Sequence, residues 1–329
     1  MFASIFKSPV VLLTGITAVL AATYSNPVEP RNGGDPSIVW HDGYYYMTST
    51  TWSNVRLRRA TTIEGLKTGE NKVIWSPDSP QRQCNVWAPE IHNLGGTWYV
   101  YFSAGGCAST DIQQSQVLIG GSSPWDDFRF FGTINTPDWS IDGTPLSIDG
   151  KDYFVYSCFR NDTGERLQSL CIGELSSPID MGPEYLLSSP TRDWERIGPF
   201  PVNEGPFAIY RNGRTFLAFS ASYCGTPDYT LALLTYEGGD PLLGSSWAKS
   251  EPQFSKANGN YGTGHNSFFT SPDGSEVWMA YHSTPNSGGS CGDRYSNVKK
   301  IEFQADGTPI LGVPLVAGEM FDGPSGEPS

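Results

Sequence analysis

Residues 204–221 read EGPFAIYRNGRTFLAFSA and combine a polar leading residue, an apolar run, a turn dipeptide and a second run rich in aromatic side chains. The turn is Asn212-Gly213, and Asn-Gly is favoured in two-residue hairpin loops because both residues readily adopt positive φ. The flanking runs hold the β-branched and aromatic residues that are typical of strands. The segment therefore predicts one β-hairpin, with the carboxylate Glu204 at the start of its first strand.

The same unit occurs four more times in the chain. Its leading residues recur at intervals of about 52 to 62 positions, which is longer than a helical repeat and fits a four-stranded propeller blade. The other copies are DPSIVWHDGYYYMTST from Asp35, WAPEIHNLGGTWYVYFSA from Trp87, DGTPLSIDGKDYFVYSCF from Asp142 and GHNSFFTSPDGSEVWMAYHS from Gly264.

Further strand-like runs lie between the hairpins and would supply the outer strands of each blade. They are VRLRRAT, SQVLIGG, LQSLCIGEL, YTLALLTYE and NVKKIEF. We therefore predict an all-β fold, a five-bladed β-propeller, in which residues 23–329 form a single domain. A β-sandwich is the competing architecture, but sandwiches seldom keep so long a period.

The first 22 residues have the composition of a secretory signal peptide. Lys7 precedes an apolar stretch of about fourteen residues that ends in small side chains near Ala21 and Ala22. A membrane anchor would need about 20 apolar residues and a basic flank, whereas polar, turn-prone residues follow here. We therefore expect a secreted, extracellular protein that is not bound to a membrane. The net charge of −13 also argues against nucleic acid as a partner, because an acidic protein repels phosphate backbones.

All six cysteines lie beyond the predicted signal peptide, and an even number in a secreted chain predicts disulfides. Fifteen pairings are possible. We favour 84–107, 158–171 and 224–291, because the first two would close short, hairpin-sized loops. A zinc site is a weak alternative, since no CxxC pair occurs. One glycosylation sequon begins at Asn161.

Carboxylates lead three of the five repeats: Asp35, Asp142 and Glu204. In a propeller the innermost strands line a central channel, so these three residues should converge in space. Crowded carboxylates repel each other, which raises at least one pKa and allows one acid to be protonated while another is ionised. The aspartates of the turn dipeptides are explained by hairpin geometry and are not expected to react: Asp42, Asp149 and Asp273.

These segments resemble those of glycoside hydrolase family 43, whose members are secreted five-bladed propellers acting on arabinofuranosides and xylosides. Four strings, DPSIVWHDGYYYMTS, WAPEIHNLGGTWYVYFS, SIDGTPLSIDGKDYFVYS and NEGPFAIYRNGRTFLAFS, are similar to the family's first four blades in order. The resemblance implies a catalytic domain with a general base at Asp35 and a general acid at Glu204. It assigns to Asp142 the tasks of raising the pKa of Glu204 and orienting it. It also implies inversion of the anomeric centre, for which the two catalytic carboxyl groups should lie roughly 6.5–9.5 Å apart.

The resemblance extends to residues around these acids. His265 resembles a family histidine near the centre of the channel, where it is either a calcium ligand or a hydrogen-bonded histidine without metal. Arg294 resembles an arginine that reaches the active site, and a surface arginine is the alternative. Trp87 is the first candidate for sugar contact because of its place in the repeat, whereas Trp52 is a weaker candidate that inter-blade packing could also explain.

The resemblance implies an exo-acting α-L-arabinofuranosidase that removes arabinose from arabinan or arabinoxylan of plant cell walls. Within the family, β-xylosidase and endo-1,5-α-L-arabinanase are the alternatives. The cysteine-bearing insertions after blades two and four favour a closed pocket and therefore exo action. A different class remains open, a non-catalytic propeller that binds sugar through an aromatic funnel. We expect a monomer that requires no cofactor, with a structural calcium ion near His265 as the one candidate.

Overall fold

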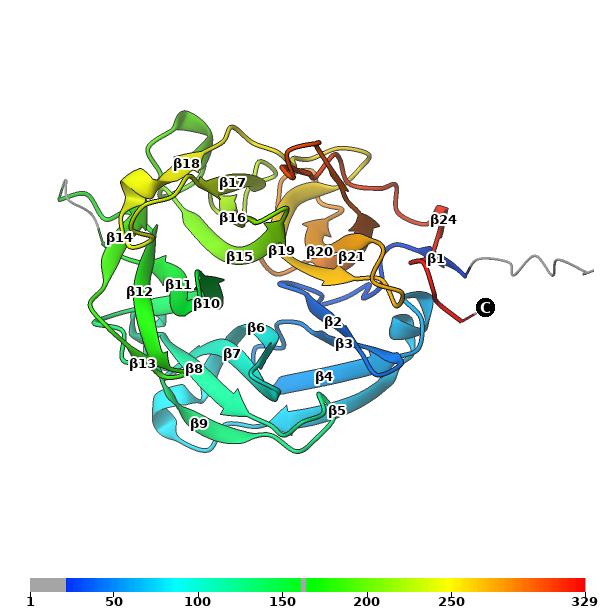
Figure 1. Cartoon of the computed structure of the whole chain (residues 1–329), viewed down its shortest axis with the longest axis horizontal. Coiled ribbons are helices and arrows are strands. Elements are labelled where there is room, and N and C mark those ends of the chain that lie inside the picture. Colours follow the sequence, from blue (N-terminus) through cyan, green and yellow to red (C-terminus); the bar gives the residue numbers. More distant parts are fainter. Residues whose placement is uncertain (1–21, 161–163, 329) are drawn as a thin grey trace, which may run out of the picture.

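The computed structural model describes residues 22–160 and 164–328. In this part of the chain, five antiparallel sheets are arranged as blades around one central axis (Figure 1). The all-β, five-bladed β-propeller predicted from the repeat is confirmed. The predicted signal peptide and the Asn161 sequon lie outside the described residues.

Each blade is built from consecutive strands that run from the axis outward. Blade one consists of β2 (Ser37–His41), β3 (Tyr44–Thr48), β4 (Val55–Ala60) and β5 (Glu70–Trp75), and blade two of β6 (Cys84–Leu94), β7 (Thr97–Gly105), β8 (Gln114–Ile119) and β9 (Arg129–Thr133). Blade three consists of β10 (Ser140–Ile148), β11 (Lys151–Cys158), β12 (Ser169–Ser177), β13 (Asp180–Met181) and β14 (Tyr185–Ser188). Blade four consists of β15 (Asn203–Arg211), β16 (Arg214–Ala221), β17 (Thr230–Tyr236) and β18 (Trp247–Lys249), and blade five of β19 (Tyr261–Thr270), β20 (Val277–Thr284) and β21 (Tyr295–Lys300).

Two small sheets and five short 3₁₀ helices complete the fold. The sheets pair β1 (Thr23–Ser25) with β24 (Met320–Asp322), and β22 (Glu302–Phe303) with β23 (Pro309–Ile310). The 3₁₀ helices are η1 (Glu64–Lys67), η2 (Pro80–Arg82), η3 (Thr110–Ile112), η4 (Asp193–Glu195) and η5 (Gly244–Ser246). None of the helices in the described ranges is long and apolar enough to cross a bilayer.

The hairpin turns follow the sequence closely. At four of the five predicted turns both residues have positive φ, for example Asp42 (46°) with Gly43 (82°) and Asn212 (52°) with Gly213 (72°). Positive φ at both positions matches the twist of the flanking strands. The fifth turn has positive φ only at Gly274 (72°), because the connection from β19 to β20 is longer than two residues.

The first described residues close the ring against the last blade (Figure 1). Val28 N donates to Ser296 O over 2.9 Å, and Ser296 N donates to Glu29 O over 3.0 Å. Blade five has three strands of its own, so the expectation of four strands from every repeat is wrong there. The segment around Glu29 takes the outer position beside β21 instead, which ties the beginning of the described chain to its end.

One apolar cluster fills each of the five gaps between neighbouring blades. Between blades four and five, for example, Phe216, Leu231 and Tyr281 are completely buried. Burying a large apolar side chain contributes about 1.5–3 kcal/mol. The ring is therefore held together between blades, and the inner strands that carry the site have fixed positions.

The three predicted disulfides are confirmed. Cys84–Cys107 and Cys158–Cys171 lie within blades two and three, whereas Cys224–Cys291 joins loops 67 residues apart in blades four and five. Among the described residues there is no free cysteine.

Candidate active site

One residue near the start of each innermost strand has a left-handed backbone. These residues are Asp35 (φ 57°), Ala88 (46°), Asp142 (55°), Gly205 (54°) and His265 (47°). The strand pairing is irregular at this point in β6, β10, β15 and β19. Such bulges bend a strand and re-aim its side chains, so in these four blades the repeat redirects the residue at this position.

Side chains of the preceding blade fix four of these five left-handed residues by accepting their peptide N–H groups. The bonds run from Asp35 N to His282 Nδ1 (3.2 Å), from Ala88 N to Thr50 Oγ1 (2.7 Å), from Asp142 N to Ser103 Oγ (3.0 Å) and from His265 N to Ser220 Oγ (2.8 Å). Neighbouring blades therefore hold the site in register through side-chain to backbone bonds.

Asp35 is buried in a cationic environment. Arg294 Nη1 and Nη2 donate to its two carboxylate oxygens over 2.7 and 3.2 Å, and Thr50 Oγ1 donates over 2.5 Å. Burial alone would raise the pKa of Asp35, but the Arg294 guanidinium, with the neighbouring histidines, holds it well below its usual range. Asp35 is therefore ionised over the ordinary pH range.

Glu204 is partly buried, and the two side chains that donate hydrogen bonds to it are neutral. Tyr229 Oη donates to its Oε1 over 2.8 Å, and Gln168 Nε2 donates to its Oε2 over 2.6 Å. Burial raises the pKa of Glu204 to about 7, although both hydrogen bonds favour the ionised form. A large fraction of Glu204 is therefore protonated at mildly acidic pH.

Asp142 is buried and faces the same space. Burial and the nearby charge of Glu204 raise the pKa of Asp142 well above its usual value. His265 lies between two of the acids, with its Nδ1 atom 3.2 Å from Asp35 Oδ1 and 4.0 Å from Asp142 Oδ2. Burial lowers the pKa of His265, so its imidazole is neutral.

The predicted residues are thus brought together from four blades. Glu204 connects to Asp35 through Tyr229, whose ring stacks on His282 with centroids 5.5 Å apart and an interplanar angle of 8°. His282 Nδ1 is in turn 3.2 Å from Asp35 Oδ1. Gly205 packs closely on His265, and an added Cβ would lie 3.1 Å from the ring, so a larger residue beside Glu204 would press on this histidine.

An aromatic cavity of about 490 Å³ lies next to this site, although the three acids are not themselves among its lining residues. Gln168, which holds Glu204, is one of its lining residues, and the Cys224–Cys291 disulfide forms part of its wall. Both predicted tryptophans line it, with Trp52 and Trp87 in an edge-to-face contact at 5.7 Å. The remaining aromatic wall consists of Trp139, Phe159, Phe200 and Tyr223.

Two acids in opposite protonation states next to an aromatic cavity are the chemistry of a glycosidase. Residues 24–309 match the model of glycosyl hydrolases family 43. The chain belongs to glycosyl hydrolase family 43.

Known members of the family are similar to almost all of this chain. The extracellular exo-α-(1→5)-L-arabinofuranosidase of Streptomyces avermitilis is 36% identical over 91% of this chain and 65% of its own length. The α-L-arabinofuranosidase 43 of Humicola insolens is 35% identical over 92% of this chain and 66% of its own length. The chain therefore spans slightly less than two thirds of these two relatives. The crystal structure of α-L-arabinofuranosidase from Lactobacillus brevis superposes with a TM-score of 0.82 at 30% identity, covering 90% of this chain and 98% of that one.

Sequence analysis missed several groups that hold the acids of this family 43 site, among them Thr50, Gln168 and Tyr229. The repeat did contain a signal for two of them. Gln168 and Tyr229 come immediately before the third strands of their blades, β12 and β17, and Arg294 comes immediately before β21. The residue before the third strand therefore reaches the acids in three blades.

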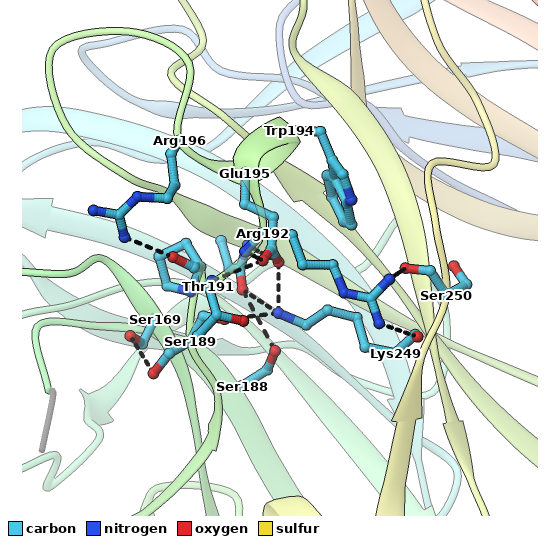
Figure 2. Close-up of polar contacts among 12 residues, drawn as sticks. Ser169, Ser188, Ser189, Thr191, Arg192, Trp194, Glu195, Arg196, Lys249 and Ser250 are labelled. Carbon is cyan, nitrogen blue, oxygen red and sulfur yellow. Dashed lines mark hydrogen bonds and ion pairs between the residues drawn. The ribbon is translucent and has the colours of Figure 1, made fainter.

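A buried ion pair supports the strand that carries Glu204 (Figure 2). Lys249 Nζ lies 2.5 Å from Glu195 Oε1, and the Glu195 side chain is completely buried. Asn203, which directly precedes Glu204, donates through Nδ2 to the same Oε1 over 3.0 Å. The backbone N–H groups of Thr191 and Arg192 complete the shell of Glu195 at 2.8 Å each. This cluster fixes the start of β15 and the loop that leads to it.

The surroundings of His265 fit a calcium ion poorly. Its Nε2 atom is buried without a hydrogen-bond partner in the described part of the chain, but Ca²⁺ takes six to eight oxygen ligands. Across the described ranges, one group of three potential ligand side chains lies close enough to share an ion, Cys158, Cys171 and Glu184, and its two cysteines form a disulfide. An ion at His265 would have to be held largely by water, and no step of the chemistry is assigned to it.

Proposed function

We propose that this protein is a secreted, exo-acting α-L-arabinofuranosidase that releases terminal arabinose from arabinan or from arabinoxylan side chains of plant cell walls. The observation that carries the proposal is the contrast between an ionised Asp35 and a protonated Glu204 in one buried cluster, which adjoins the aromatic cavity through Gln168. The names of the relatives support arabinofuranosides as the substrate class. The signal-like composition of residues 1–22 supports secretion.

Glu204 acts as the general acid in this proposal. With the sugar in the cavity, its proton passes to the glycosidic oxygen as the bond to the anomeric carbon breaks. Gln168 and Tyr229 keep the carboxyl group in place during this transfer. Both also stabilise the carboxylate that remains, because each donates a hydrogen bond to it.

Asp35 acts as the general base, accepting a proton from the water that attacks the opposite face of the sugar. Single displacement inverts the anomeric centre. Because Arg294 holds its pKa low, Asp35 is a weak base. We therefore infer that the glycosidic bond is largely broken before water attacks. The oxocarbenium-like centre that forms needs little activation of the water, and the negative charge of Asp35 stabilises it.

Asp142 maintains the acid in its protonated form. Burial raises the pKa values of both Asp142 and Glu204, and the charge of Glu204 raises that of Asp142 further, so the two carboxyl groups retain at least one proton between them near neutral pH. The charge that develops when either ionises holds the proton on the other. Trp87, Trp52 and Arg294 are the proposed contacts of the sugar, and the protein is proposed to act as a monomer without a cofactor.

The experiment is product analysis with the purified protein on four substrates: nitrophenyl α-L-arabinofuranoside, nitrophenyl β-D-xyloside, debranched arabinan and arabinoxylan. Release of arabinose alone supports the proposal. Xylose release, or arabinan fragments of intermediate length, would instead assign β-xylosidase or endo-arabinanase activity.

A matched variant tests the acid. Glu204→Gln keeps the size of the side chain and removes the proton donor, so turnover of arabinan should fall by roughly 10²–10⁴-fold. Undiminished turnover would show that another group is the acid. Sugar binding with no hydrolysis in the parent protein would favour a non-catalytic, sugar-binding propeller.

A further inference from the structure

A second cavity of about 600 Å³ lies beside the active-site cavity and is lined by the loops of blade two and by the connection that leads to blade three. The two cavities have two lining residues in common, Asp111 and Trp139. Trp139 is fixed at this boundary, because its Nε1 donates to Thr110 O over 2.8 Å and its ring packs on Phe159 with centroids 4.2 Å apart. A chain that leaves the active-site cavity across Trp139 enters the second cavity, which we call the outer cavity.

Gln113 lines the outer cavity and is the feature that points to a ligand. Its side chain is completely buried, yet within the described ranges neither its amide nitrogen nor its amide oxygen has a hydrogen-bond partner. A buried amide of this kind is costly to leave unpaired. A sugar hydroxyl can donate and accept, so it would supply the missing partner directly or through a bridging water.

The position of Gln113 in the repeat strengthens this reading. It immediately precedes β8, the third strand of blade two, as Gln168, Tyr229 and Arg294 precede the third strands of blades three to five. Those three side chains bond the carboxylates of Glu204 and Asp35. In blade two the equivalent side chain has no acid to hold and faces the outer cavity instead.

The side chains that line the outer cavity indicate which class of ligand it can bind. The polar side chains of the outer cavity are Gln81, Gln113, Gln114, Asp111 and Asp138, and none of its lining residues within the described chain is cationic. Asp111 is engaged by Arg166 over 2.7 Å. Amides and carboxylates next to a tryptophan suit a neutral, hydroxyl-rich ligand and repel an anionic one.

We propose that the outer cavity binds the neutral sugar units that follow the scissile bond, so that the polysaccharide leaves the active-site cavity across Trp139. This inference rests on the proposed function, because it assumes that the active-site cavity holds the terminal arabinose. It adds that specificity for a polymer over a small aryl glycoside resides in the loops of blade two and the connection to blade three, outside the active-site cavity.

The test uses two substitutions that fill the outer cavity with a tryptophan side chain and leave the lining of the active-site cavity unchanged. Ala108 and Gln81 are exposed and line only the outer cavity, so Ala108→Trp and Gln81→Trp should fold and block it. Val313→Trp, at a position 55% exposed and away from both cavities, is the matched control. The substrates are nitrophenyl α-L-arabinofuranoside and a linear α-1,5-linked arabinotetraose.

Both blocking variants should lower kcat/KM for the tetraose by about tenfold or more, chiefly through KM, and leave the aryl glycoside within about twofold. The control should leave both substrates unchanged. Equal effects on both substrates, or no effect on either, would overturn the role of the outer cavity while the parent remains an active arabinofuranosidase. A parent protein that hydrolyses neither substrate would overturn the proposed function itself.

Discussion

Arg294 donates hydrogen bonds to both carboxylate oxygens of Asp35, over 2.7 and 3.2 Å, from a position 259 residues further along the chain. The pairing is possible because the first described segment lies against β21 and closes the ring. Gly34 makes room for it, since an added Cβ there would lie 2.5 Å from the Arg294 guanidinium. Closure of the propeller and ionisation of the proposed base therefore depend on the same contact between blades five and one.

Removing this guanidinium should move the acid limb of the pH–rate profile. In Arg294→Met the Asp35 carboxylate loses the charge that holds its pKa low, so we expect the midpoint of the acid limb to rise by roughly 1–3 pH units. Arg294→Lys keeps the charge but loses the paired geometry, so a smaller rise is expected. The measurement is kcat/KM from about pH 3 to pH 9. An unchanged acid limb in Arg294→Met would mean that Asp35 does not set it.

The unmodified protein should show a bell-shaped pH dependence of kcat/KM. Glu204 must be protonated to act, and its pKa is raised to about 7, so activity should fall as pH rises through about 7. Asp35 must be ionised, and its pKa is lowered, so the acid limb should lie below the ordinary aspartate range. A profile that is flat from about pH 3 to pH 9 contradicts the role of Glu204, because its carboxyl group would then not be titrating in the range where activity should fall.

Tyr229→Phe should shift the alkaline limb in a direction that the contacts determine. The Tyr229 hydroxyl donates to Glu204 Oε1 and favours the ionised form. Losing it should raise the pKa of Glu204 by about one unit, which corresponds to a charge-assisted hydrogen bond of about 1.4 kcal/mol. Tyr101→Phe removes a hydroxyl that bonds Pro178 O away from the acids and serves as the control. A downward shift in Tyr229→Phe would be incompatible with the assigned hydrogen bond.

Lys249→Met should destabilise the fold strongly. It leaves the completely buried carboxylate of Glu195 without its cation, and breaking a buried ion pair in this way costs about 3–5 kcal/mol. The free energy of unfolding, measured with denaturant, checks this value. Glu195→Gln combined with Lys249→Met should recover part of the loss, because no unpaired charge remains. Lys72→Met, which removes the partner of the exposed Asp127, should have a much smaller effect.

The fold was accessible from sequence because its information is local. Dipeptides such as Asn212-Gly213 predict a hairpin from their backbone preferences alone, and the number of repeats predicts the number of blades. The disulfide pairing followed from loop length for Cys84–Cys107 and Cys158–Cys171, and the third pair followed by elimination. The three-stranded fifth blade was not predictable in this way, because its outer position is filled by residues from the opposite end of the chain.

The sequence predicted mainly those site residues that occupy the same position in each repeat. Asp35, Asp142 and Glu204 stand out because they lead repeats, and family resemblance added His265 and Arg294. Gln168 and Tyr229 lie in connections whose lengths differ from blade to blade, so periodicity did not align them. Their effect on Glu204 depends on distances of 2.6 and 2.8 Å, which follow from packing between blades and not from any local pattern.

The most direct test of the central claim is the anomeric configuration of the first product. Proton NMR during the hydrolysis of nitrophenyl α-L-arabinofuranoside resolves the newly released arabinose before its anomers equilibrate. If Glu204 protonates the leaving oxygen while Asp35 activates a single water, β-L-arabinofuranose should appear first. Initial formation of the α anomer would show retention through a covalent intermediate and would contradict the assigned roles of Asp35 and Glu204.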